Sequence, residues 1–386
     1  MTDTQAVRAG RLFDGHRFRE EAIVLVQDGR IVDVAGDAGG LPIQDLGDDV
    51  TLLPGLVDAH VHLSFDASLD LLTGFEVDDD ALLQRMRESA VTTLMAGVTT
   101  VRDLGDRSFL AVTLAREIAA GRTQGPHILA AGPPLTTPGG HCWFLGGEVD
   151  GRDAMLRAVA ARAAAGCSDV KVMVSGGHIT PGSLPWEAQF GVEDLSASVE
   201  EAHRLGLRAA AHVHGASSVE AAVTAGFDTL EHVTFVSPDG IDVDPTVLQR
   251  IADTGAVVSV TAGALAHYAP PPAIAARMQA VMGTMLRLHE LGARMVVGSD
   301  AGVGPGKPHG VTPHALRTLL DGGVSVSAGL RMMTSAAAEA LGLEGVKGVL
   351  AAGADADLLA VRGDPERDSN VLHDVVGVWS GGVRVR

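Results

Sequence analysis

Short apolar segments alternate with segments of helical periodicity through the middle of this chain. Several of the helical segments, including 82–97, 152–166 and 192–206, end on a glycine, the residue that commonly follows the last turn of a helix. Strands that alternate with helices build parallel sheets, and eight such units over about 290 residues favour an α/β fold of the (β/α)8 TIM-like barrel type. An open doubly wound sheet is less consistent, because no glycine-rich phosphate loop follows the first apolar segment. The apolar segments are 56–62, 98–103, 127–131, 169–174, 207–214, 227–232, 256–260 and 294–299.

Both ends of the chain have the pattern of short strands joined by tight turns. Segments 22–26 and 30–34 flank Gln27-Asp28-Gly29, a hairpin signal, and the tail has similar segments at 357–361 and 376–379. We therefore expect the two termini to pair in one small domain, a β-sandwich made of residues 1–54 plus 346–386. It would pack on a barrel domain of residues 55–345.

Composition excludes several classes of partner. The formal net charge of −19 disfavours binding to nucleic acid or to an anionic membrane surface. No apolar run approaches the roughly 20 residues of a membrane span, and the first residues do not resemble a secretory signal. Cys142 and Cys167 are too few for a disulfide framework. These features predict a cytoplasmic protein that acts on a small molecule.

Polar residues lie at the carboxyl ends of several of the expected strands. In a barrel these ends meet at one mouth, where active sites are built. His60 and His62 are two apart on one strand, so both imidazoles face the same volume and can bind a metal ion together. So many buried polar groups are costly unless a cation organises them. The residues concerned are His60, His62, Lys171, His212, His214, Glu231, His232 and Asp300.

The donor types in this set indicate which metal ion it would hold. Imidazole and carboxylate ligands suit Zn²⁺, with Mn²⁺, Co²⁺ or Fe²⁺ possible, and the lack of a thiolate excludes a closed structural zinc site. Open coordination positions allow the metal ion to activate a water molecule. Asp300 is placed to accept that water's proton and to pass it to a leaving group.

Lys171 is unusual because the chain has only three lysines against 26 arginines. It lies in Asp-Val-Lys-Val-Met-Val, residues 169–174, which otherwise reads as a buried strand. A snorkelling or ion-paired lysine is the ordinary interpretation of such a residue. A role that a guanidinium cannot fill is the alternative.

The ordered motifs of this chain resemble those of the amidohydrolase superfamily. The resemblance runs through nearly the whole chain and is greatest to the branch with imidazolonepropionase-like enzymes, bacterial prolidases (Xaa-Pro and Xaa-Arg dipeptidases) and ochratoxinase-like amidases. It is carried by the segments 53–63, 96–103, 171–177, 211–215, 231–232, 298–302 and 353–358.

The resemblance implies a role for each candidate ligand. His60, His62 and Asp300 would hold one divalent ion, and His212 and His232 would hold a second. Lys171 would be N-carboxylated and bridge both ions, since only an amine can take up CO₂ as a carbamate. His214 is either a further ligand or a residue that contacts the ligands and not the ion. Relatives often assemble, so a homo-oligomer is possible.

Three further histidines are candidates for substrate binding. The resemblance suggests His141 and His309, whereas relatives more often carry an aliphatic residue at position 178, so His178 either bears on specificity or is simply exposed. His141 lies in the loop after the third strand, His178 in the loop after the fourth, and His309 in the loop after the eighth. Two departures concern the loop after the eighth strand and the tail: a glutamate common in relatives is Ala315 here, and a usual lysine is Ala354. They weaken inference about the substrate and leave the ligand set intact.

The leading hypothesis is therefore a binuclear metal hydrolase that cleaves the amide bond of a dipeptide-like N-acyl amino acid or of a small amide, with Asp300 as general base and acid. A second hypothesis is hydrolysis of a cyclic amide or imidazolone, a carbamate or a urea by the same residues. A third is a metal-binding barrel without catalytic activity, which would be expected to have lost some of its ligands.

Overall fold

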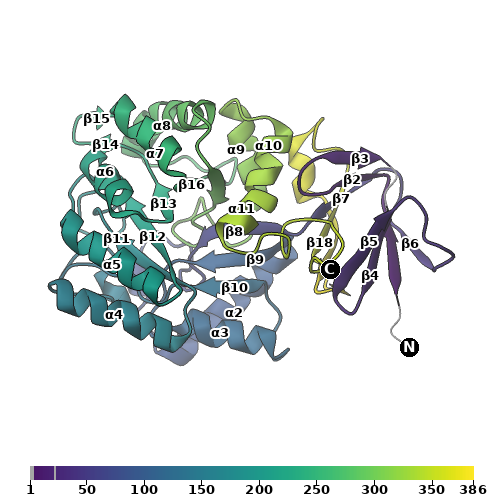
Figure 1. Cartoon of the computed structure of the whole chain (residues 1–386), viewed down its shortest axis with the longest axis horizontal. Helices are drawn as coiled ribbons and strands as arrows, with labels where there is room; N and C mark the ends of the chain where they lie inside the picture. The colour runs from purple at the N-terminus through teal and green to yellow at the C-terminus, as the bar shows by residue number, and fades with distance from the viewer. Residues whose placement is uncertain (1–3, 21–22) are drawn as a thin grey trace.

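The alternation of strands and helices is present in the structure. The computed structural model describes residues 4–20 and 23–386, and in the larger part of the molecule strands lie centrally with helices around them, whereas the strands of the two termini lie at one side (Figure 1). The central strands pair in parallel in two sheets, of order β10-β9-β8 and β11-β12-β13-β16-β17. Their bounds are β8 (Leu56–Val61), β9 (Val98–Asp103), β10 (His127–Ala130), β11 (Asp169–Met173), β12 (Arg208–Val213), β13 (Thr229–His232), β16 (Val257–Thr261) and β17 (Met295–Gly298).

Isolated bridges connect the two parallel sheets at both ends. Val61 at the end of β8 makes a parallel bridge with Ala301 after β17, and Leu135 after β10 makes one with Val172 of β11. The backbone pairing is thus divided into three and five strands rather than continuous over eight. All eight strands nevertheless point the same way, so their carboxyl ends lie on one side.

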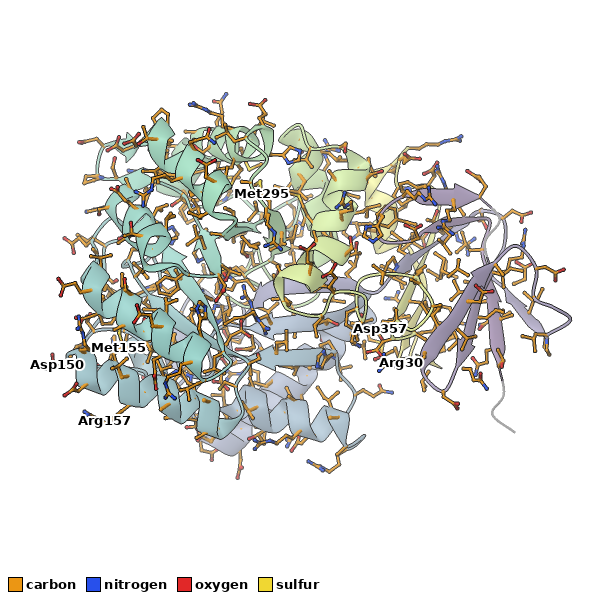
Figure 2. The ribbon with its side chains drawn as sticks, viewed as in Figure 1. Arg30, Asp150, Met155, Arg157, Met295 and Asp357 are labelled. Atoms are coloured by element: carbon orange, nitrogen blue, oxygen red, sulfur yellow. The ribbon has the colours of Figure 1, made fainter. Side chains whose placement is uncertain are left out.

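Helices cover the outer side of the parallel strands (Figure 1). In α4 (Arg152–Ala165), Met155 and Val159 are one turn apart and buried, whereas Arg157 is exposed (Figure 2). Gly166 ends this helix with a φ of 94°, a left-handed conformation that favours glycine. The other main helices are α2 (Asp79–Met95), α3 (Leu110–Ala119), α5 (Val192–Arg204), α6 (Ala216–Ala225), α7 (Pro245–Thr254), α8 (Pro272–Glu290), α9 (Ala315–Asp321), α10 (Val326–Met332) and α11 (Ser335–Ala340), and α1 (Leu71–Gly74) is a single turn.

The two ends of the chain share a sheet. β7 (Val50–Pro54) pairs antiparallel with β18 (Leu358–Arg362), in a six-stranded sheet of order β20-β19-β18-β7-β2-β3. A four-stranded sheet of order β5-β4-β1-β6 comes from the N-terminal segment alone. The other strands of these two sheets are β1 (Gln5–Arg8), β2 (Arg11–Phe13), β3 (Phe18–Glu20), β4 (Ile23–Gln27), β5 (Arg30–Ala35), β6 (Ile43–Asp45), β19 (Val375–Ser380) and β20 (Val383–Arg384), and β14 (Val236–Ser237) pairs with β15 (Gly240–Ile241) in a separate hairpin.

Local turn chemistry explains these terminal hairpins. Asp28 and Gly29 have φ of 52° and 77°, the left-handed pair required by the tight turn between β4 and β5. The predicted first strand began at Ala22, which lies outside the described residues. Arg30 and Asp357, labelled in Figure 2, belong to the region where the terminal strands meet, and Arg30 Nη1 pairs with Asp355 Oδ1 at 2.7 Å.

Apolar burial joins the terminal strands to one another. Val7, Val24 and Leu52 belong to one buried cluster with Leu358 and Trp379, so residues from both terminal sheets pack together. Of the helices in the described ranges, none is both long enough and apolar enough to cross a membrane.

Candidate metal centre

Six predicted ligands gather where the parallel strands end. His60 lies in β8 and His62 follows it, Lys171 lies in β11, His212 in β12 and His232 at the end of β13, and Asp300 comes shortly after β17. Five of these side chains are buried, and the Asp300 side chain is 14% exposed. The parallel direction of the strands therefore brings together residues spread over most of the chain.

The backbone is strained at two of these positions. His232 and Asp300 have φ of 73° and 59°, in the left-handed region that non-glycine residues rarely adopt. Each such residue costs about 1–3 kcal/mol and persists only where the surrounding structure holds it. The left-handed φ changes the direction of the backbone, and with it that of the side chain, where each strand ends.

The first donor group consists of His60, His62 and Asp300. Nε2 of His60 lies 3.2 Å from Nε2 of His62, and Asp300 Oδ1 lies 3.5 Å from each. His60 Nδ1–H donates to Glu231 Oε2 at 2.9 Å, and His62 Nδ1–H donates to the Gly105 carbonyl at 3.1 Å. Since each neutral imidazole carries one proton, both Nε2 atoms present lone pairs to one another.

This arrangement fits a divalent cation. Two lone pairs and a carboxylate oxygen facing one point repel each other unless a positive charge lies between them. Two nitrogens bound to one Zn²⁺ at about 2.0–2.1 Å in tetrahedral geometry lie about 3.3 Å apart. The separation of 3.2 Å between the two Nε2 atoms matches that spacing.

The second donor group is built on His212 and His232. His232 Nε2 lies 3.1 Å from His212 Nδ1. His212 Nε2–H donates to the Gly176 carbonyl at 3.1 Å, which leaves Nδ1 as the free donor atom of that ring. His232 Nδ1 lies 2.7 Å from the Thr261 hydroxyl, which can accept the Nδ1 proton and leave Nε2 free.

His214 is close enough to join this second group. A ring nitrogen of His214 lies within 4.8 Å of ligand atoms of His212 and His232. The His214 ring stacks on that of His232, with centroids 4.7 Å apart and planes 14° apart, and its Nδ1 lies 2.9 Å from the Thr234 hydroxyl. His214 thus has the position of a direct ligand or of a residue that supports the ring of His232.

Burial keeps the candidate ligand histidines neutral. It lowers the pKa of His60, His212 and His232 well below the ordinary value, with further lowering by neighbouring histidines and by the Lys171 charge. Burial also lowers the pKa of His62, and the nearby Asp300 charge partly offsets that effect. Neutral imidazole is the form that binds a metal ion.

Lys171 is buried without a partner for its amine. Its side chain is 1% exposed, and its Nζ makes no hydrogen bond within residues 4–20 and 23–386. Burial lowers the pKa of Lys171 to about 8, and the nearby carboxylates of Glu231 and Asp300 oppose that shift. The ordinary interpretation, an ion-paired or snorkelling lysine, does not fit these surroundings, because the amine is buried and has no hydrogen-bond partner among the described residues. The alternative, a role that a guanidinium cannot fill, fits them.

Comparison with known proteins identifies the family. Residues 51–385 match the sequence model of the amidohydrolase family. The chain belongs to the amidohydrolase family. It is accordingly a hydrolase that acts on C–N bonds, and its His and Asp groups are consistent with the metal dependence of that family.

Relatives of this amidohydrolase include proteins of the branch expected from the sequence. Ochratoxinase from Aspergillus niger is 26% identical over 417 residues, which cover 96% of this chain and 83% of ochratoxinase. A solved Xaa-Pro dipeptidase with bound methionine in its active site matches with a TM-score of 0.89 at 26% identity, and both chains are covered completely. The solved A. niger ochratoxinase matches with a TM-score of 0.85 at 25% identity, covering 100% of this chain and 96% of that one.

Of the three histidines predicted to bind substrate, His141 lies beside the second donor group of this amidohydrolase. It is buried, and its ring centroid is 4.7 Å from that of His212. Its Nδ1 has no hydrogen-bond partner in the described part of the chain. Burial lowers the pKa of His141 to about 3, with smaller contributions from His178 and Lys171. Gly177 leaves room for this ring, because a Cβ there would lie 2.3 Å from His141 Nε2.

The other two histidines occupy different surroundings. His178 is exposed, and its ring centroid lies 5.5 Å from that of His214. His309 Nε2–H donates to the Phe65 carbonyl at 2.8 Å, so one of its nitrogens is engaged by the backbone. His309 belongs to neither donor group, although the Phe65 ring stacks on His62 with centroids 4.9 Å apart.

Sequence reasoning did not identify the residues that hold the ligands. Asp58 Oδ1 accepts the backbone N–H groups of His60 and Ser299 at 3.1 and 2.9 Å, and Asp58 Oδ2 accepts the Thr312 hydroxyl at 2.5 Å. Asp58 thereby ties the first strand to the segment that carries Asp300. A carboxylate inside the apolar segment 56–62 is the signal that could have indicated this role.

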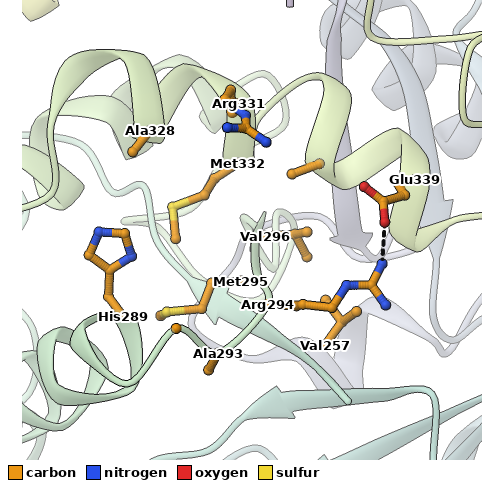
Figure 3. Close-up of a pocket in the computed structure, with 12 residues that line it drawn as sticks. Val257, His289, Ala293, Arg294, Met295, Val296, Ala328, Arg331, Met332 and Glu339 are labelled. Atoms are coloured by element: carbon orange, nitrogen blue, oxygen red, sulfur yellow. Dashed lines mark hydrogen bonds and ion pairs between the residues drawn. The ribbon is translucent and has the colours of Figure 1, made fainter. Parts of the chain in front are cut away.

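A pocket elsewhere in this amidohydrolase lies away from the donor groups. Val257 and Met295, which line it, are the first residues of β16 and β17, so it lies at the amino ends of these strands. It has a volume of about 270 Å³, and an ion pair between Arg294 and Glu339 closes one side (Figure 3). The candidate ligands lie at the opposite, carboxyl ends.

Proposed function

We propose that this chain is a binuclear metal-dependent amidohydrolase. The observation that carries the proposal is the first donor group, where the Nε2 lone pairs of His60 and His62 face each other beside Asp300. These three residues would hold one divalent ion, and His212 and His232 would hold the second. Zn²⁺ suits the donor set best, and Mn²⁺, Co²⁺ and Fe²⁺ are the alternatives.

We infer that Lys171 is N-carboxylated and links the two ions. The neutral amine attacks CO₂, a new N–C bond forms, one proton is released, and the product is a carbamate anion with two oxygen donors. Two features support this reaction: the amine has no hydrogen-bond partner among the described residues, and a pKa lowered by burial to about 8 increases the share of neutral amine. An arginine at this position could not react in this way.

The residues of the site divide the catalytic work. When bound, two divalent ions activate a water molecule and polarise the carbonyl group of the scissile bond. Asp300, partly exposed and adjacent to both Nε2 atoms, accepts a proton from the attacking water and donates it to the leaving nitrogen. His141 would donate a hydrogen bond to the substrate, and His178 and His309 would contact it further out.

The preferred substrate class is a dipeptide-like N-acyl amino acid or another small amide. The support is that one similar solved structure is named as an Xaa-Pro dipeptidase and a curated relative as an ochratoxinase. A cyclic amide or imidazolone, a carbamate or a urea is the second candidate, because the same residues would attack any of these carbonyl groups. A barrel that binds metal without catalysis is the third.

A metal-reconstituted activity screen tests the function. Protein loaded with Zn²⁺ or Mn²⁺ is assayed against dipeptides, N-acyl amino acids, lactams, carbamates and ureas, with Asp300→Asn as the control. Turnover of dipeptides or N-acyl amino acids that the variant lacks is the expected result. Turnover confined to the other substrates would favour the second candidate, and tight metal binding without any turnover would favour the third.

We also infer how the sheets form domains. The bridges Val61–Ala301 and Leu135–Val172 support one (β/α)8 barrel over residues 55–345. The apolar cluster shared by the terminal sheets supports a β-sandwich domain of residues 1–54 plus 346–386.

A further inference from the structure

The four ligand histidines differ in what holds the ring nitrogen that faces away from the ligand position. His62 donates to the Gly105 carbonyl, His212 donates to the Gly176 carbonyl, and His232 faces the Thr261 hydroxyl. These three partners are neutral. His60 alone is paired with a carboxylate, that of Glu231, at 2.9 Å.

Glu231 is fixed by a closed set of donors. Its Oε1 accepts Arg102 Nη2–H at 2.8 Å and the Thr229 hydroxyl at 2.7 Å, and Thr229 Oγ1 in turn accepts Arg102 Nη1–H at 3.1 Å. Among the described residues, its Oε2 has one hydrogen-bond partner, His60 Nδ1. Glu231 and Arg102 are both 0% exposed, so bulk solvent does not reach these bonds. All of the groups around this carboxylate are hydrogen-bond donors.

Arg102 is itself anchored across several strands. From β9 it donates through Nε to the Ala59 carbonyl of β8 at 2.8 Å, and through Nη1 to Asp169 of β11 at 3.3 Å. The guanidinium thus connects the backbone beside His60 with the carboxylate that pairs with the same ring. A buried ion pair of this kind contributes little net stability, so its geometry rather than its energy suggests a role.

We propose that Glu231, held by Arg102, is a positioning residue that keeps His60 protonated on Nδ1 and so presents the Nε2 lone pair to the metal ion. The proposal rests on the metal centre of the proposed function and extends it. A carboxylate acceptor strengthens the donor character of the opposite ring nitrogen more than a neutral acceptor does. We therefore expect the ion between His60, His62 and Asp300 to be the more tightly bound of the two.

Glutamine at position 231 would disrupt this arrangement while keeping the side-chain shape. If its oxygen stays on Arg102 and Thr229, its NH₂ group faces His60 Nδ1 and moves the imidazole proton to Nε2. The Nε2–H then donates to His62 Nε2, only 3.2 Å away, and the lone pair needed for the ion is lost. If the amide turns round, its NH₂ group meets the Arg102 N–H, and two donors face each other.

Stepwise metal titration tests the proposal. Metal-free wild type and Glu231→Gln are titrated with Zn²⁺ against a competing chelator, and Co²⁺ absorption reports each equivalent separately. We expect the wild type to bind its two metal equivalents with unequal affinity. In the variant, the affinity for the tighter equivalent should fall 10- to 100-fold, and the affinity for the other should be unchanged. Thr261→Val should weaken the other equivalent, and Glu339→Gln, a surface residue paired with Arg294, should weaken neither.

Each alternative outcome has a distinct meaning. Wild-type affinities in Glu231→Gln, equal weakening of both equivalents, or weakening of the same equivalent by Thr261→Val would overturn the proposal. A wild type that binds no metal would refute the proposed function instead. If Glu231→Gln fails to fold, ¹⁵N NMR of the metal-free wild type decides: a proton on His60 Nδ1 supports the proposal, and one on Nε2 contradicts it.

Discussion

His141 provides a quantitative test of burial at the centre. Its ring is 2% exposed, and burial lowers its pKa to about 3, whereas a free histidine titrates near 6.5. Because the folded pKa lies below the unfolded one, the unfolded chain takes up a proton at this residue before the folded protein does. The corresponding stability is fully present above pH 6.5 and is lost as the pH falls toward the folded pKa.

The magnitude follows from linkage. From about pH 7.5 to about pH 5.5, an unfolded histidine with a pKa of 6.5 gains proton-binding free energy of about 1.4 kcal/mol, while the folded one stays neutral. Wild type should therefore lose about 1.4 kcal/mol more stability over this range than His141→Asn. The variant's own destabilisation cancels, because only the change with pH is compared.

Urea unfolding of both metal-free proteins at three pH values measures this difference. Metal must be removed because bound ions would add their own pH dependence. Stability curves that run parallel for wild type and His141→Asn would mean that His141 titrates like a free histidine. Burial beside His212 would then be refuted, and with it the position from which His141 is proposed to contact the substrate.

Four further predictions concern single residues and the metal ions. Asp300→Asn should abolish turnover while most of the metal stays bound, and measurements of kcat and of metal content on the same protein check this. A near-normal rate would exclude proton transfer by Asp300. Gly177→Ala should cost about 1–3 kcal/mol in urea unfolding, since its Cβ would lie 2.3 Å from His141 Nε2, and an unchanged midpoint would contradict this tight packing. Lys171→Arg should lose the carbamate and the activity together, and a variant that keeps wild-type turnover would rule out a required carbamate at this position. Chelation should remove about 4 kcal/mol of stability relative to protein at a thousandfold excess of metal over Kd, and an unchanged Tm would argue against bound metal.

The parallel strands were largely predictable because their pattern is local. Apolar segments of five to eight residues bounded by glycine and polar residues determine where the eight parallel strands lie, and the observed bounds differ from the predicted ones by at most two residues. The pairing between sheets was less predictable. β10 ends at Ala130, and Leu135 in the following loop bridges β11 at Val172, so the contact depends on a loop conformation without periodicity.

The site was predictable as a set of residues but not as a geometry. Strand direction alone brings His60, His62 and Asp300 to one side, and the sequence shows where each strand ends. Which nitrogen each ring presents depends on partners from distant elements: Glu231 is 171 positions from His60, and Gly105 belongs to the loop after β9. Such pairs depend on which strands become neighbours, and the order of residues does not reveal that.

The central claim is that two divalent ions bind between these residues. A crystal structure of zinc- or manganese-loaded protein, with anomalous diffraction data at the metal edge, tests it most directly. The account predicts two anomalous peaks, one beside His60, His62 and Asp300 and one beside His212 and His232, with a carboxylated Lys171 between them. Density without ions at the strand ends, or an unmodified amine directed away from a single ion, would contradict it.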